Sequence, residues 1–122
     1  MNDQRLISLA SGTLPEFDPI TVVEAAASAN FTGCGVWFDS QTWDKSQTKA
    51  VTNAFSRSGL TPLEIEVVMV GEDFYLDSSD RVLEAGAEIG CTEAIIVSTD
   101  SLQSRFSDNF GRIAEQASTY QM

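Results

Sequence analysis

Short apolar runs alternate with helical stripes along this chain. Most of the runs lack the polar alternation of a half-exposed strand, so they are typical of strands buried on both faces of a parallel sheet. The pattern predicts four strands, at residues 5–10, 34–39, 63–70 and 93–97.

Each apolar run is followed by a segment in which apolar residues recur at helical spacing. Asp18 can cap the first helix and Pro19 suits its first position. Asn30, Gly59 and Gly90 are the expected helix stops, and they stand about thirty residues apart, the length of one βα unit. The predicted helices span residues 18–30, 45–59, 79–90 and 101–120. The pattern therefore predicts an α/β fold of four βα units, with a parallel sheet in sequence order and all helices on one face.

Composition narrows the class of protein. A chain of 122 residues is one domain, 1–122, and no apolar run approaches the ~20 residues of a membrane span. A net charge of −11 argues against nucleic-acid binding, which needs basic residues. The polar N-terminus does not resemble a secretory signal, so we expect a cytoplasmic protein in which Cys34 and Cys91 are reduced packing residues.

Several kinds of catalytic site are excluded by residue content. The chain has no histidine, which removes Ser-His nucleophiles and histidine metal ligands. It has no Gly-Lys pair for a phosphate loop, and residues 33–38 lack the third glycine of a dinucleotide fingerprint. Residues 71–80 form a long predicted βα loop, which we interpret as a place for function.

Carboxylates are the chemistry that remains. Alternation along residues 63–70 places Glu64 and Glu66 on one face with Val68 and Val70, and it assigns the opposite, apolar face to the helices. Buried carboxylates need a cation, a hydrogen-bond network or water. Glu66 is therefore a candidate for binding substrate or a divalent metal. The alternative is a structural ion pair or a solvated strand start, especially for Glu64.

Polar and aromatic residues also gather where the predicted strands end. Ligands of parallel α/β sheets bind at that end, although acidic residues there also cap helices. We interpret Asp100 as a cap, and Trp37 either as a core residue or as the apolar wall of a sugar site. The other acidic residues at strand ends are Asp39, Glu72 and Asp73.

The order of these motifs resembles xylose isomerase-like TIM-barrel proteins, which include sugar isomerases and epimerases. The matching residues are Asp18-Pro19, then Ala29-Asn30-Phe31 and Gly33-Cys34-Gly35-Val36-Trp37, where the family has "AG(F)xGxGLW". Asn30 stands at the family's usual glycine. Residues 63–68 resemble the acidic third strand, and residues 81–97 resemble the third helix and fourth strand, "LxxAxxLGaxxvvv".

The resemblance implies half of a TIM (β/α)8 barrel, because a full barrel needs eight units and about 250 residues. The chain is expected to be a truncated N-terminal half that is inactive alone, so whether it is an enzyme stays open. Trp37 and Glu66 are the substrate-binding candidates, for a sugar or sugar phosphate. The family's metal ligands lie on later strands, so no cofactor is expected in this chain. A divalent metal (Mg, Mn or Co) is implied only for a full-length member.

Two other interpretations remain. The chain can be a non-enzymatic α/β binding or interaction module, or an open flavodoxin-type sheet with a ligand loop at residues 10–13. A half-barrel would expose a concave apolar face and two open strand edges, so we also expect a homodimer, with closure into an eight-stranded barrel as one form.

Overall fold

The computed structural model describes residues 5–122, which form one parallel sheet and the helices that connect its strands. The strands lie in the order β1-β2-β3-β4, each hydrogen-bonded to the next in sequence. The elements are β1 (Ser8–Leu9), the 3₁₀ helix η1 (Ser11–Thr13), α1 (Pro19–Ser28), β2 (Gly33–Trp37), α2 (Lys45–Ser58), β3 (Thr61–Val70), α3 (Leu76–Ile89), β4 (Glu93–Ser98) and α4 (Gln103–Thr119).

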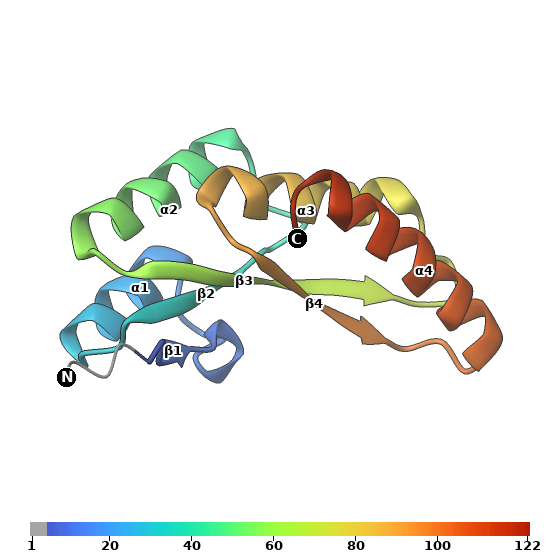
Figure 1. The fold of residues 1–122 in the computed structure, drawn as a ribbon, viewed down its shortest axis with the longest axis horizontal. Coiled ribbons are helices and arrows are strands. Elements are labelled where there is room, and N and C mark those ends of the chain that lie inside the picture. The colour runs from blue at the N-terminus through green and yellow to red at the C-terminus, as the bar shows by residue number, and fades with distance from the viewer. Residues whose placement is uncertain (1–4) are drawn as a thin grey trace.

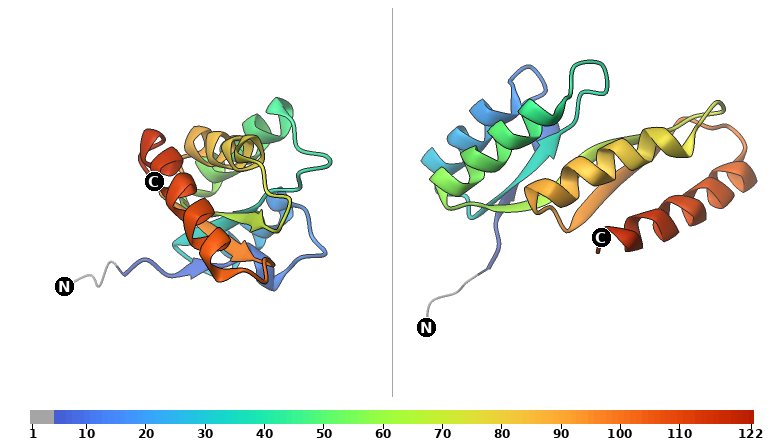
Figure 2. Two further views of the ribbon diagram at one scale, coloured as in Figure 1. Left: turned by 90° about the vertical axis from the view of Figure 1, so that its right-hand side faces the viewer. Right: turned by 90° about the horizontal axis from the view of Figure 1, so that it is seen from above.

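All four α-helices lie on one side of the sheet (Figure 1). The view from above agrees, because α2 and α3 lie over the strands there (Figure 2, right). This arrangement confirms the predicted βα units. The opposite side of the sheet carries no helix, and we call it the inner face. Within residues 5–122, no helix combines the length and apolar character needed to cross a membrane.

The predicted helix ends are confirmed by local geometry. The Asp18 carboxylate accepts hydrogen bonds from the backbone N–H groups of Ile20 and Thr21, which caps α1, and Pro19 occupies its first turn. The stops at Asn30, Gly59 and Gly90 adopt left-handed backbone with φ of 64°, 70° and 104°. Asparagine tolerates this conformation better than most residues, which explains how Asn30 replaces glycine.

Two predicted boundaries are wrong. Helix α3 begins at Leu76, so the long functional loop predicted at residues 71–80 shrinks to residues 71–75. The hydroxyls of Ser78 and Ser79 donate to the carbonyls of Tyr75 and Leu76 in the first turn, and Leu76 packs against the core. Strand β1 pairs with β2 only through Ser8 and Leu9, which makes it shorter than the apolar run at residues 5–10.

The side chains of β3 point to the predicted faces of the sheet as far as Glu66. Beyond it, the side chains point to the faces opposite to those predicted. Between Glu66 and Val68, β3 advances two residues while β4 advances one, so Val67 is an extra residue in the ladder. Beyond it Val68 is 2% exposed, whereas Met69, expected against the helices, is 54% exposed. A bulge shifts the alternation by one, and alternation alone does not reveal it.

The core lies between the sheet and the helices. Cys34, Val36 and Ile65 point from β2 and β3 into this layer, where they meet buried residues of α1, α2 and α3. The inner face is different, because four of its apolar side chains remain exposed in the single chain: Trp37, Met69, Ile95 and Val97.

Candidate functional site

Glu66 lies near the centre of the inner face, and its carboxylate is already engaged. It is 7% exposed, and its Oε1 accepts hydrogen bonds from the Ser11 hydroxyl at 2.5 Å and the Gly12 backbone N–H at 2.9 Å. Both donors belong to η1, which follows β1, so the Glu66 side chain spans β2 to reach them. Glu66 therefore fixes the position of the loop between β1 and α1.

The Glu64 side chain extends across β2, where Gly35 has no side chain and leaves room for it. A Cβ atom built on Gly35 would collide with Glu64 Oε1, so only glycine accommodates this carboxyl group. Glu64 is 6% exposed, and its Oε2 is buried without a hydrogen-bond partner. Burial raises the pKa of Glu64, and the nearby charges of Glu66 and Glu93 raise it further. Burial and these two charges therefore work against the ionised form of this carboxyl group.

Trp37 stands beside Glu66 on the inner face. Their Cα atoms are register partners across β2 and β3, and the Phe38 N–H donates to the Glu66 carbonyl at 2.6 Å. Trp37 is 38% exposed, so it is not a core residue of the single chain, and the sugar-wall interpretation stays a prediction. The structure therefore brings the two predicted substrate residues together on adjacent strands.

A cavity of about 310 Å³ opens beside Trp37, and we call it the Trp37 cavity. It lies between the β1–α1 loop and the β2–α2 loop, at the carboxyl ends of β1 and β2, where TIM barrels place their sites. Glu66 does not line it. The lining residues are Pro15, Glu16, Phe17, Asp18, Pro19, Trp37, Asp39, Thr42, Trp43 and Gln47.

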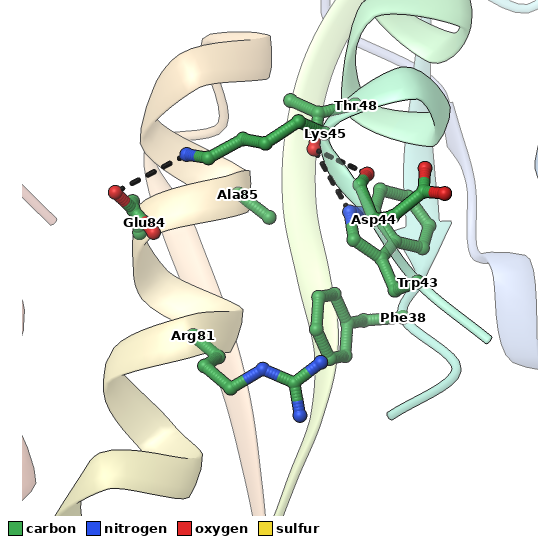
Figure 3. Close-up of a pocket in the computed structure, with 8 residues that line it drawn as sticks. All are labelled: Phe38, Trp43, Asp44, Lys45, Thr48, Arg81, Glu84 and Ala85. Atoms are coloured by element: carbon green, nitrogen blue, oxygen red, sulfur yellow. Dashed lines mark hydrogen bonds and ion pairs between the residues drawn. The ribbon is translucent and has the colours of Figure 1, made fainter. Parts of the chain in front are cut away.

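A second cavity, of about 170 Å³, lies between the start of α2 and α3 (Figure 3). Its polar groups are engaged with one another. Trp43 Nε1 donates to the Thr48 hydroxyl at 2.9 Å, Lys45 Nζ lies 3.2 Å from a Glu84 oxygen, and the Arg81 guanidinium lies over the Phe38 ring at 5.7 Å. We interpret this cavity as a packing groove between helices.

Three of the other acidic residues at strand ends, Asp39, Glu72 and Asp100, have structural partners. Asp100 accepts from the Leu102 N–H and makes a two-pronged ion pair with Arg105 at 2.6 and 2.7 Å, and these bonds lower its pKa. Glu72 lies 3.7 Å from the same guanidinium. Asp39 accepts from the Gln41 N–H within its own turn. Asp100 therefore has a structural role, but it is not the N-cap as predicted: the cap of α4 is Leu102, and Asp100 holds the start of the helix through the Leu102 N–H and Arg105.

The cysteines are free and buried, as predicted. Burial, and then the charge of Glu64, raise the pKa of both Cys34 and Cys91 to about 12, so both thiols are protonated at neutral pH. Thiolate chemistry is therefore disfavoured at either position.

Sequence reasoning missed the donors that hold Glu66. Ser11 and Gly12 fall in residues 10–13, which were considered only as a faint ligand loop. Their small, polar character after a strand was the available signal. No pattern indicated Phe17 or Gln47, which join the Trp37 cavity through loop geometry alone.

Comparisons with known proteins add information on the fold. No protein-family model matches the sequence, and no curated protein matches it. A "xylose isomerase-like TIM barrel/4-hydroxyphenylpyruvate dioxygenase fusion protein" superposes with a TM-score of 0.73 at 16% identity, covering 94% of this chain and 20% of that one. An AP endonuclease of family 2 from Brucella melitensis superposes with a TM-score of 0.71 at 18% identity, covering 97% and 53%.

The chain spans about half or less of the length of these two proteins. Each of its four βα units, a strand followed by a helix, is the repeating unit of a TIM barrel. The fold of this chain is therefore that of part of a TIM barrel.

Proposed function

We propose that this chain forms half of a sugar isomerase- or epimerase-like barrel, contributes part of its substrate-binding wall and lacks isomerase activity alone. The observation that carries the proposal is the pairing of Trp37 and Glu66 in register on the inner face, next to the Trp37 cavity. An exposed indole can pack on the C–H groups of a sugar, and carboxylates accept hydrogen bonds from its hydroxyls.

The lining of the Trp37 cavity favours a neutral sugar over a sugar phosphate. Among the described residues that line it there is no lysine or arginine, whereas Glu16, Asp18 and Asp39 are acidic. Phosphate recognition uses basic side chains or free backbone N–H groups. The first N–H groups of α1 are already occupied by Asp18. A phosphorylated substrate would need its phosphate group to be bound outside the Trp37 cavity.

The donor set supports the expectation that the chain alone does not turn over a sugar. Among residues 5–122, no three Cys, Asp or Glu side chains are arranged to hold a metal ion, and the sequence has no histidine. The Mg²⁺, Mn²⁺ or Co²⁺ ion that the family resemblance implies for a full-length member therefore does not fit the residues present. Such an ion would have to be held by strands that this chain does not supply.

The test combines sugar binding with turnover. Neutral aldoses and ketoses are titrated into the chain by ligand-observed NMR, and their interconversion is assayed with Mg²⁺, Mn²⁺ and Co²⁺. We expect weak, saturable binding without turnover. Trp37→Ala should weaken binding about 3- to 10-fold through lost aromatic packing, while Tyr75→Ala, an exposed aromatic outside the cavity, should leave it unchanged.

Two results would contradict the proposal. Binding that is indifferent to Trp37→Ala would show that the predicted wall does not contact sugar. Metal-dependent interconversion by this chain alone, abolished by Glu66→Gln, would show that the half-barrel is a complete enzyme.

The second candidate function is a non-enzymatic interaction module. The exposed apolar side chains of the inner face favour it, because monomeric proteins rarely leave such a surface uncovered. Absence of sugar binding together with stable protein–protein association would favour this candidate.

A further inference from the structure

The exposed large apolar side chains of this chain are concentrated at its uncovered surfaces. Of the ten such residues among residues 5–122, eight lie on the inner face, at the β1 edge or on α4, while Phe17 and Tyr75 lie in loops. The eight are Leu6, Ile7, Trp37, Met69, Ile95, Val97, Leu102 and Phe110.

Helix α4 is only half packed. Its predicted apolar stripe is present, but Ile113 is fully buried whereas Leu102 is 50% and Phe110 is 46% exposed. The helix packs beside α3 at the β4 end of the sheet (Figure 2). In a (β/α)8 barrel each outer helix also packs against the next strand around the barrel. The exposed part of this stripe therefore indicates a missing strand beside β4.

The sheet ends in two open edges. Strands β1 and β4 each have a neighbour on one side only, and all strands run parallel. Unpaired N–H and C=O groups along such edges can accept another strand.

We propose that two copies of this chain close into one eight-stranded barrel around a two-fold axis, with β4 of each copy beside β1 of the other. Strands related by an axis along the barrel remain parallel, so both new seams have the pairing that a TIM barrel requires. This closure covers the inner face and both edges, and it places Leu6 and Ile7 of one copy near Ile95, Val97 and α4 of the other. The inference rests on the half-barrel fold and not on the proposed sugar ligand.

Closure also completes the site that the single chain leaves open. Trp37 and Glu66 form one wall of an interior whose opposite wall would be the same two residues from the second copy. The carboxyl groups of Glu64 and Glu66 do not prevent the two inner faces from approaching each other. The Glu66 carboxylate is hydrogen-bonded to Ser11 and Gly12, and the Glu64 carboxyl group lies against Gly35, so each group is held by contacts within its own copy that closure does not break.

Sedimentation velocity of the full chain across a hundredfold range of concentration tests the proposal, and it needs no ligand. We expect a species of twice the 13.2 kDa of one chain. Met69→Lys and Val97→Lys place a charge on the inner face at positions that are exposed in the single chain, and each should weaken dimerisation about tenfold or more. Tyr75→Lys is the matched control on a distant loop and should dimerise normally.

Hydrogen exchange provides a second measurement that does not depend on a variant. The backbone amides of Ser8–Leu9 and Glu93–Ser98 should become more protected as the concentration rises. A stable monomer that does not bind a hydrophobic dye would overturn the proposal, since the inner face would then be covered within one chain. So would open-ended oligomers, or a dimer that is insensitive to both lysine variants. Because none of these readouts involves sugar, failure here is distinct from failure of the proposed function.

Discussion

At the scale of single residues, Glu66 acts mainly as a connection between elements that are distant in sequence. One oxygen joins β3 to the hydroxyl of Ser11 and the N–H of Gly12, more than fifty residues earlier. Hydrogen bonds to a buried charged group are stronger than those between neutral groups. The loop that begins at η1 also carries Phe17 into the Trp37 cavity, so Glu66 influences that cavity without lining it.

We predict that Ser11→Ala lowers the free energy of unfolding by about 1.5–3 kcal/mol, because it removes a hydrogen bond to a charged carboxylate that stays buried. Urea denaturation measures the change, with Ser56→Ala on the exposed surface of α2 as the control. Combining Ser11→Ala with Glu66→Gln should cost less than the two changes separately, since both remove the same bond. Fully additive costs would contradict the coupling.

Glu64 provides a prediction on pH. Its folded pKa is raised above the ordinary value of 4.5, so the folded chain holds a proton that the unfolded chain has released. Stability is therefore highest below about pH 4.5, as far as this group is concerned, and is lost as the pH rises through the folded pKa. Glu64→Gln removes this loss. The variant should be more stable than the wild type at pH 7, by on the order of 1 kcal/mol.

The difference should vanish near pH 4, where Glu64 is protonated in both folded and unfolded chains. Thermal unfolding at a series of pH values measures it, and Glu115→Gln, at an exposed position of α4, is the control. A Glu64→Gln variant that is less stable at pH 7 would indicate that the ionised carboxylate has a favourable partner.

At the scale of elements, two glycines within helices separate the effect of tight packing against a neighbouring strand from the low intrinsic helix propensity of glycine. A Cβ atom on Gly86 in α3 would lie 2.6 Å from Ile65 Cγ2, so Gly86 sets how closely α3 approaches β3. A Cβ atom on Gly111 in α4 would meet nothing within 4 Å. We predict that Gly86→Ala destabilises the protein by about 1–3 kcal/mol, while Gly111→Ala stabilises it by about 0.5–1 kcal/mol. Calorimetry of both variants checks the opposite signs.

Sequence periodicity predicted the elements well because local physical effects decide them. Asp18 and Pro19 set the start of α1, and the left-handed residues Asn30, Gly59 and Gly90 end three helices without tertiary help. The bulge at Val67 depends on how β3 pairs with β4, so no local pattern reveals it.

The candidate site was predictable only in part, for a related reason. Trp37 and Glu66 could be proposed from their positions near strand ends. The donors of Glu66 and the residues of the Trp37 cavity meet only when the β1–α1 and β2–α2 loops fold beside each other. The start of α3 at Leu76 was missed because the predicted helix begins only at residue 79, whereas the hydroxyls of Ser78 and Ser79 bond to the carbonyls of Tyr75 and Leu76 within the first turn.

At the scale of the whole molecule, closure of two copies sets apolar burial against charge repulsion. Each chain carries a net charge of −11, so two copies repel each other at a distance. The surfaces that closure would cover are apolar in the single chain, including Met69, Ile95 and Val97. Because salt screens the repulsion between the two charged copies, the affinity of dimerisation should rise with ionic strength.

We predict that dimerisation strengthens as salt rises from 0.05 to 0.5 M, because the Debye length falls from about 14 Å to about 4 Å and screens the repulsion, while apolar burial is not weakened. Sedimentation equilibrium at several NaCl concentrations measures the dissociation constant. The Met69→Lys variant should stay weaker than the wild type at every salt concentration, since screening does not restore an apolar contact on the inner face. Dissociation of the dimer by salt would instead show that ion pairs hold it together. The exposed pairs of Lys45 with Glu84 and Glu88 on the helical side would then be the first place to look, and closure through the inner face would be rejected.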